Sequence, residues 1–282
     1  MRINANIAAL NAQRNLGVTQ GQLGKSLEKL SSGYRINRAA DDAAGLAISE
    51  GLRSEIRGNA QAQRNAQDGI SFLQTAEGAL TEVHSMLQRM RELAVQASNA
   101  TSTGTAEDGE VQELLTEITA IGARTKFSGN AVFQDYSAAG AALNFQVSAS
   151  GVAAEQVQYS KNLTLSATSI AGTTVPAITL TGGTPALKTT NAQQAITDID
   201  NAIKAVSQTR ADLGATQNRL EHTVANLGVS VENLTASESR IRDVDMAEEM
   251  VTFTRNNILS QAGTAMLAQA NQVPQSILQL LR

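Results

Sequence analysis

Apolar side chains recur every seven residues in two long stretches of this 282-residue chain, and each stretch predicts a long helix. Two apolar columns, three positions apart, run through residues 73–97, as in the seam of a coiled coil. Two further columns run through residues 196–234, which is roughly 40 residues or about 60 Å of helix. A helix of that length needs a long partner, so we predict that the two stretches pair antiparallel. The predicted core seam consists of Leu73, Leu80, Val83, Leu87, Met90, Ile196, Ile199, Ile203, Val206, Leu213, Leu220, Val224, Leu227, Val231 and Leu234.

Two polar residues, Arg210 and Gln217, interrupt the second seam. A polar residue at a seam position ordinarily sets the register of a coiled coil at some cost in stability. The alternative is a polar layer that lets neighbouring helices shift between two packings.

Both ends of the chain carry apolar helical stripes with few charges. Residues 256–281 contain no charged side chain, but eight Asn and Gln residues interrupt them, which a membrane span would not tolerate. A stripe that suits neither lipid nor open water predicts burial against other chains. The predicted inner assembly interface consists of Ile3, Ile7, Leu10, Leu23, Leu27, Leu30, Val244, Val251, Ile258, Ile277, Leu278 and Leu281.

Turn signals divide the rest of the chain. Gly33 predicts the end of a first helix, and Asp41 and Asp42 suit the first turn of the next. A shorter helix is expected over residues 111–121, a turn at 127–130, and a β-hairpin from the alternating residues 143–147 and the returning 157–159. Residues 163–190 are rich in Thr, Ser, Ala and Gly, which indicates short strands and loops on the outside.

These elements predict a mainly α fold, with long antiparallel coiled-coil helices and a small β-hairpin region at the end distal to both termini. We expect four segments: an N-terminal inner segment (1–44), an N-terminal part of the core domain with the short helix and β region (45–190), a long C-terminal core helix (191–236) and a C-terminal inner segment (237–282).

Composition excludes several functions. Aromatic residues make up 3% of the chain and the net charge is −4 without a basic run, so nucleic-acid binding is not expected. Cysteine is absent, which removes disulfides and thiolate metal sites. His84 and His222 lack metal or catalytic spacing, and helix capping explains Asp41 and Asp42 better than acid–base chemistry. We therefore expect no catalytic residues, no cofactor, no metal and no membrane partner. The N-terminus lacks the apolar run of a signal peptide, which indicates a cytoplasmic protein or another export route.

Several stretches near both ends form a recognisable set: residues 3–7, 9–16, 30–37 and 40–48 near the N-terminus, and 232–234, 239–249 and 269–275 near the C-terminus. Together they resemble bacterial flagellin. The resemblance implies a structural subunit that self-assembles into the extracellular flagellar filament for swimming. Paired terminal helices would form an inner tube, the long helices a surrounding layer, and the short middle would make it a minimal two-layer flagellin. It also implies unfolded passage through the flagellar type III export apparatus without a cleaved signal peptide, and cap, junction and export-chaperone proteins as partners.

Residues 88–95 also resemble the segment that a Toll-like innate receptor of a host reads in many flagellins. The motif implies Arg89 and Leu93 as contact residues, with Glu110 as the third. The alternative is that Arg89 and Leu93 serve subunit packing alone.

The sequence therefore predicts a non-enzymatic, self-assembling structural protein. A hook–filament junction protein of the same superfamily is the nearest alternative, and a coiled-coil scaffold or signalling module is the alternative from another class.

Overall fold

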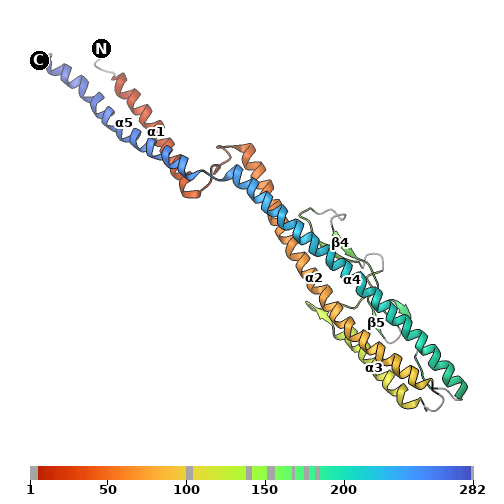
Figure 1. Ribbon diagram of the computed structural model, residues 1–282. Helices are drawn as coiled ribbons and strands as arrows, with labels where there is room; N and C mark the ends of the chain where they lie inside the picture. The colour runs from red at the N-terminus through yellow and green to blue at the C-terminus, as the bar shows by residue number, and fades with distance from the viewer. Residues whose placement is uncertain are drawn as a thin grey trace. The chain divides into compact units, whose positions relative to one another are not determined.

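The computed structural model describes residues 6–99, 104–137, 142–150, 156–166, 169–174, 178–181 and 185–280 (Figure 1). Its elements are α1 (Ile7–Ser32), α2 (Ala43–Ala97), α3 (Thr105–Arg124), β1 (Lys126–Phe127), β2 (Asn130–Ala131), β3 (Leu143–Gln146), β4 (Gln156–Tyr159), β5 (Leu165–Ser166), β6 (Ser169–Ile170), β7 (Thr173–Thr174), α4 (Pro185–Arg242) and α5 (Met246–Leu280). The predicted mainly α fold, with long helices and small antiparallel strand pairs, is confirmed. The chain forms two compact units: a terminal unit (1–56 and 232–282) and a central unit (57–231).

In the terminal unit, α1 and α5 lie side by side along their length (Figure 1). The Asn6 side chain caps α1 by accepting a hydrogen bond from the Ala9 backbone N–H at 3.1 Å. Gly33 ends the helix in the left-handed region, at φ 75°, and so confirms the predicted break. The carboxylate of Asp42 accepts a hydrogen bond from the Gly45 N–H at 2.9 Å, just before α2 becomes regular, so this carboxylate does cap a helix.

In the central unit, α2 and α4 run antiparallel. The Arg91 guanidinium bonds to Asp200 at 2.7 Å, and Glu77 pairs with Arg210 at 3.5 Å. The number of the α4 residue rises as that of its α2 partner falls, which is the signature of antiparallel neighbours. The heptad pattern therefore predicted the correct pairing of the two long helices.

Most of the predicted seam residues enter the core of the central unit. Leu73, Leu80, Val83, Leu87, Met90, Ile199, Val206, Leu213, Leu220 and Leu227 are buried, whereas Ile196, Ile203, Val224, Val231 and Leu234 are half-buried. The second buried column of α4 stands one residue earlier than the heptads predicted. It consists of the small side chains Ala195, Ala202, Thr209 and Thr216.

The two buried threonines of this column are satisfied within their own helix. The Thr209 hydroxyl donates to the Ala205 carbonyl at 2.9 Å, and the Thr216 hydroxyl to the Asp212 carbonyl at 2.8 Å. Because these bonds satisfy the hydroxyl groups, a threonine can occupy a seam position without a hydrogen-bond partner on the facing helix.

The strands lie against the sides of the helices. Ser128 and Gly129 adopt positive φ in the tight turn between β1 and β2, as the sequence predicted for residues 127–130. In the antiparallel β3–β4 hairpin, Phe145 lies opposite Val157. This hairpin packs closely on α2, because a Cβ at Gly69 would stand 2.8 Å from the Phe145 ring.

The segment 163–190 requires a correction. The whole segment was expected on the outside, but Leu163, Leu165, Ile170, Ile178 and Leu180 are buried in the core of the central unit. The helical part of the segment also begins early, since α4 starts at Pro185. The β5–β7 sheet therefore covers the core, and α3 contacts it closely enough that only glycine fits at position 122.

Candidate assembly surface

The large apolar side chains exposed to solvent concentrate in the terminal unit. Those in the terminal unit are Ile7, Leu10, Val18, Leu27, Tyr34, Ile48, Met246, Met250, Val251, Ile258, Leu259 and Met266, whereas the central unit exposes Val95, Leu187 and Val229. The buried apolar side chains show the reverse distribution. Among the described residues, Ile36 is the single buried apolar residue of the terminal unit, and all the others belong to the central unit. Exposed apolar surface on this scale marks an interaction site.

The seam between α1 and α5 is built mostly from small or polar side chains. The positions of α1 that face the seam are Ala9, Ala12, Leu16, Thr19, Leu23, Ser26 and Leu30, and those of α5 are Glu249, Phe253, Asn256, Ser260, Gly263, Leu267 and Ala270. At its centre, Leu16 lies 3.2 Å from where a Cβ on Gly263 would stand. Its ends are joined by a hydrogen bond from Asn6 to the Ala270 carbonyl at 2.7 Å and by the Lys29–Glu249 ion pair at 3.9 Å.

The predicted inner assembly residues consequently separate into two groups. Leu23, Leu30 and Val244 are half-buried within the terminal unit, whereas Ile7, Leu10, Leu27, Val251 and Ile258 are exposed. Ile3 and Leu281 lie outside the described residues, and Ile277 and Leu278 belong to α5 without a described side-chain environment. The exposed members of the stripe therefore turn away from the intramolecular seam, and they leave apolar surface that the terminal unit does not cover.

Exposed apolar residues occur on every free side of α5. At roughly 100° per residue, Met246 and Met250 lie on one flank of the α1-facing side, Val251 and Ile258 opposite to it, and Leu259 and Met266 on the other flank. A shallow groove along this helix is lined by Met250, Val251, Thr254, Arg255, Ile258 and Leu259. A helix that is apolar all round is ordinarily buried on all sides.

A row of glycines crosses the exposed surface of α1. Gly17, Gly21 and Gly24 are spaced by four and three residues, so they share one face, and a Cβ at any of them would meet nothing within 4 Å. Glycine inside a helix costs about 1 kcal/mol relative to alanine. No intramolecular contact in the structure requires these three glycines.

Two short linkers are tied together in the terminal unit. Tyr34 and Asp243 form an antiparallel bridge, and the Arg35 backbone N–H donates to the Arg242 carbonyl at 2.6 Å. The Arg242 guanidinium lies 4.7 Å from the centre of the Tyr34 ring and bonds to Glu50 at 2.7 Å. This bond is the main cause that lowers the pKa of the Glu50 carboxyl, with a smaller contribution from Arg53. No local pattern in the sequence indicates this contact.

The residues predicted for receptor recognition lie in the central unit. Arg89 of α2 donates to both carboxylate oxygens of Glu110 in α3, at 2.8 and 3.3 Å, and this pairing is the main cause that raises the pKa of Arg89. Both side chains are about half-exposed. Leu93 is 3% exposed and belongs to the core of the unit, so in the free chain it supports this surface from inside.

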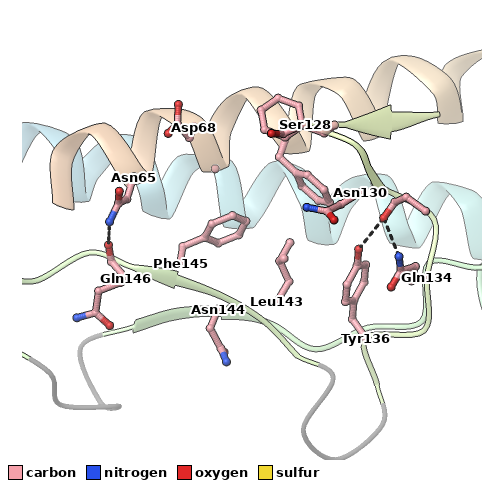
Figure 2. A pocket seen from close by; sticks show the side chains of 14 residues that line it. Asn65, Asp68, Ser128, Asn130, Gln134, Tyr136, Leu143, Asn144, Phe145 and Gln146 are labelled. Carbon is pink, nitrogen blue, oxygen red and sulfur yellow. Dashed lines mark hydrogen bonds between the residues drawn. The ribbon is translucent and has the colours of Figure 1, made fainter. Parts of the chain in front are cut away.

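The central unit also has an open hollow of about 580 Å³ between α2, the β1–β2 turn and β3 (Figure 2). Phe72 packs edge-on against both Phe127 and Phe145 in its lining. Asn65 donates to the Gln146 carbonyl at its rim, and Asp68 is the one carboxylate that lines it. A single carboxylate does not provide the pair of carboxylates that an acid–base site of that kind needs.

The described residues also include no group of three or more His, Cys, Asp or Glu side chains placed to hold a metal ion. Within the same residues, no helix is long and apolar enough to cross a membrane.

Comparison with known proteins agrees with the resemblance at both ends of the chain. The sequence model of the bacterial flagellin N-terminal helical region matches residues 3–138, and that of the C-terminal helical region matches residues 196–281. The flagellin of Halalkalibacterium halodurans is 54% identical over the full length of both chains. The chain belongs to the bacterial flagellin family. The flagellin of Bacillus subtilis is 48% identical, again over the full length of both.

Among solved structures, Bacillus cereus flagellin aligns with 58% of this chain and 88% of its own, at 32% identity and a TM-score of 0.44. Family membership confirms the predicted function, a structural subunit of the extracellular flagellar filament. Nothing in the comparisons favours a junction protein or a scaffold module.

Proposed function

We propose that copies of this chain associate through the paired helices α1 and α5, and that the central unit folds on its own core. The observation that carries the proposal is the opposite placement of apolar residues in the two units: exposed in the terminal unit, buried in the central one. Fully burying one such side chain stabilises by about 1.5–3 kcal/mol. Neighbouring copies would supply that burial, since these side chains lie outside the α1–α5 seam.

The glycine row on α1 supports the same surface. A glycine that costs helix stability and touches nothing in its own chain is explained if another helix approaches the backbone there closely. The apolar residues on all free sides of α5 require several neighbours at once, as a helical lattice provides and a simple dimer does not.

A matched pair of substitutions tests the location of the surface. Leu10 in the terminal unit and Leu187 in the central unit are both 55% exposed. Leu10→Lys should abolish growth of filaments from purified subunits on seeds, because a charge would be buried at the contact. Leu187→Lys should leave growth unchanged, and circular dichroism should show both variants folded. Normal growth by Leu10→Lys, or equal loss by both variants, would contradict the proposal.

Family membership supports further proposals about export and partners. We infer that the subunit is exported unfolded through the flagellar type III apparatus, and that export-chaperone, cap and junction proteins bind it. We assign it no enzymatic activity, no cofactor and no nucleic-acid or membrane partner, in accordance with the structural role of the family.

Recognition by a Toll-like receptor of a host is a second proposal, favoured by the Arg89–Glu110 pair. This pair presents a guanidinium and a carboxylate from two helices on one half-exposed surface, and the two residues are two of the three contacts that the resemblance implies. Replacing Arg89 with Ala should lower signalling in receptor-expressing reporter cells, and Arg124→Ala, which removes a salt bridge to Glu117 of comparable exposure, should not. Equal signalling by both variants would leave Arg89 with a role in subunit packing only.

A further inference from the structure

The methionines among the described residues divide sharply by environment, and Met1 lies outside those residues. Met246, Met250 and Met266 are 48%, 49% and 63% exposed, and all three belong to α5. In the central unit, Met86 is half-buried and Met90 is fully buried. We propose that the three α5 methionines are an oxidation site at which conversion to methionine sulfoxide blocks assembly of the free subunit. This inference rests on the proposed assembly surface.

The chemistry needs only an exposed thioether and a peroxide. The sulfur lone pair attacks one oxygen of hydrogen peroxide, the O–O bond breaks as the S–O bond forms, and the remaining oxygen leaves as water after proton transfer. Sulfur loses two electrons and the peroxide gains them. Because the rate depends on access to sulfur, the half-exposed α5 residues should react well before Met90.

The positions of the three methionines on α5 explain why their oxidation would block assembly. Met246 and Met250 are one helical turn apart on one flank of α5, and Met266 lies on the opposite flank. Met250 also lines the apolar groove beside Val251 and Ile258. A sulfoxide adds a strongly polar, chiral oxygen, and burying such a group without a hydrogen-bond donor is unfavourable. Oxidation would therefore act on two faces of the helix that contact different neighbours.

The assembled state should differ from the free one. If neighbours cover α5, the sulfur atoms lose access to peroxide, so filaments resist oxidation that disables free subunits. The surface would then sense oxidant only before assembly, and methionine sulfoxide reductases could restore it, since the modification is reversible. Methionine also suits a surface that must adapt to several neighbours, because its side chain is flexible and polarizable.

The test treats purified free subunits and preformed filaments of the full chain with hydrogen peroxide. Peptide mass spectrometry follows each methionine, and sedimentation with electron microscopy measures growth on seeds. We expect an added oxygen at the three α5 positions before Met90, slower oxidation of those positions in filaments, and a rise of about tenfold or more in the subunit concentration needed for growth. Reduction by a mixture of both methionine sulfoxide reductases should restore growth.

Two variants separate this site from the other methionines. M246L/M250L/M266L should grow equally well before and after peroxide, whereas M86L/M90L should lose growth as the unsubstituted chain does. Undiminished growth by the oxidised chain, or equal loss by the triple variant, would overturn the inference while leaving the assembly surface intact. If the triple variant does not grow at all, recovery of growth by the oxidised, unsubstituted chain after reductase treatment tests the same inference without substitutions. Failure of the untreated chain to extend seeds would instead refute the proposed function itself.

Discussion

Arg242 donates a hydrogen bond to the Glu50 carboxylate at 2.7 Å while its guanidinium lies 4.7 Å from the centre of the Tyr34 ring. The pair joins the start of α2 to the end of α4 in the terminal unit, where few other large side chains are buried. Arg35 reinforces it by donating from its guanidinium to the Ile241 carbonyl at 2.7 Å. The two linkers therefore depend on charge-assisted bonds where an apolar core would ordinarily act.

The first prediction concerns the acid sensitivity of this joint. The folded-state pKa of Glu50 is lowered, so its stabilising contribution is present above the unfolded pKa and is lost as the pH falls through the folded one. Arg242→Gln should raise the Glu50 pKa by more than Arg53→Gln does, since Arg242 is the larger cause. Carbon NMR titration of the Glu50 carboxyl measures both. A larger rise of the Glu50 pKa with Arg53→Gln would show that Arg53, and not Arg242, is the main cause of the lowered pKa.

A pair of glycines in α2 gives the second prediction. Gly69→Ala should destabilise the central unit, because the new Cβ would stand 2.8 Å from the Phe145 ring and 3.2 Å from Leu220. Gly78→Ala, where a Cβ meets nothing within 4 Å, should stabilise it by about 0.5–1 kcal/mol through the helix propensity of alanine. Urea unfolding of both variants provides the measurement. Stabilisation by both would mean that the hairpin moves aside at little cost.

The third prediction follows from the buried β5–β7 segment. Ile170→Ala should destabilise the central unit by about 2–4 kcal/mol, because Ile170 is fully buried and the change leaves a cavity. The control is Leu187→Ala, whose exposed side chain should contribute within about 0.5 kcal/mol. Thermal unfolding compares the two. Equal stability of the two variants would show that Ile170 contributes no more to the core than an exposed residue does.

The sequence predicted the long helices well because most positions of their predicted columns hold Leu, Val, Ile or Met at heptad spacing, which is the strongest local signal a chain carries. The buried Ala and Thr column of α4 carries a weaker apolar signal, so the prediction placed this column one residue too late. The sequence predicted the α1–α5 pair less well. Ala, Ser, Asn and Gly carry little apolar signal, so the seam that contains Ser26 and Asn256 was not visible, while the outward-facing Ile258 and Val251 dominated the pattern.

Two other features of the structure were not predicted from the sequence, each for a different reason. Strands of two residues, such as β5 and β6, are too short to show an alternation of apolar and polar residues. The sequence pattern therefore did not predict the burial of Leu165 and Ile170. The Arg242–Glu50 pair joins residues 192 positions apart, and no local spacing records such a contact. Tertiary contacts of this kind become visible only once the fold brings the helix ends together.

The fourth prediction concerns the order of α1 and α5 in the free subunit. Their seam buries little beyond Ser26 and Asn256, which should not offset the conformational entropy of two long helices. Backbone amides of residues 256–270 should therefore exchange with solvent much faster than those of residues 80–90 in the same free subunit. Assembly into filaments should slow them. Equally strong protection of both segments in the free subunit would show that the pair is stable alone.

The last prediction concerns filament shape. Arg210 reaches across from α4 to Glu77 of α2 at 3.5 Å, and its Nε is buried without a hydrogen-bond partner among the described residues. Gln217 instead bonds to Glu221 within its own helix at 3.1 Å. Of these two seam residues, Arg210 is therefore the one that forms a described polar contact with the facing helix. Such a contact can exchange partners between packings of nearly equal free energy, which a curved filament needs.

Replacing both residues with Leu should raise the melting temperature of the free subunit by about 2–4 °C, if the removed polarity costs about 1 kcal/mol. The same change should bias filaments toward one form, since an apolar seam holds a single packing. Gln217→Leu alone should retain the normal variety of shapes, because the Arg210–Glu77 link remains. Electron microscopy over a range of pH and salt records the waveform beside the thermal melt. If the double variant keeps every waveform, Arg210 sets only the register of the helix pair, and the shape of the filament must be decided at contacts between copies.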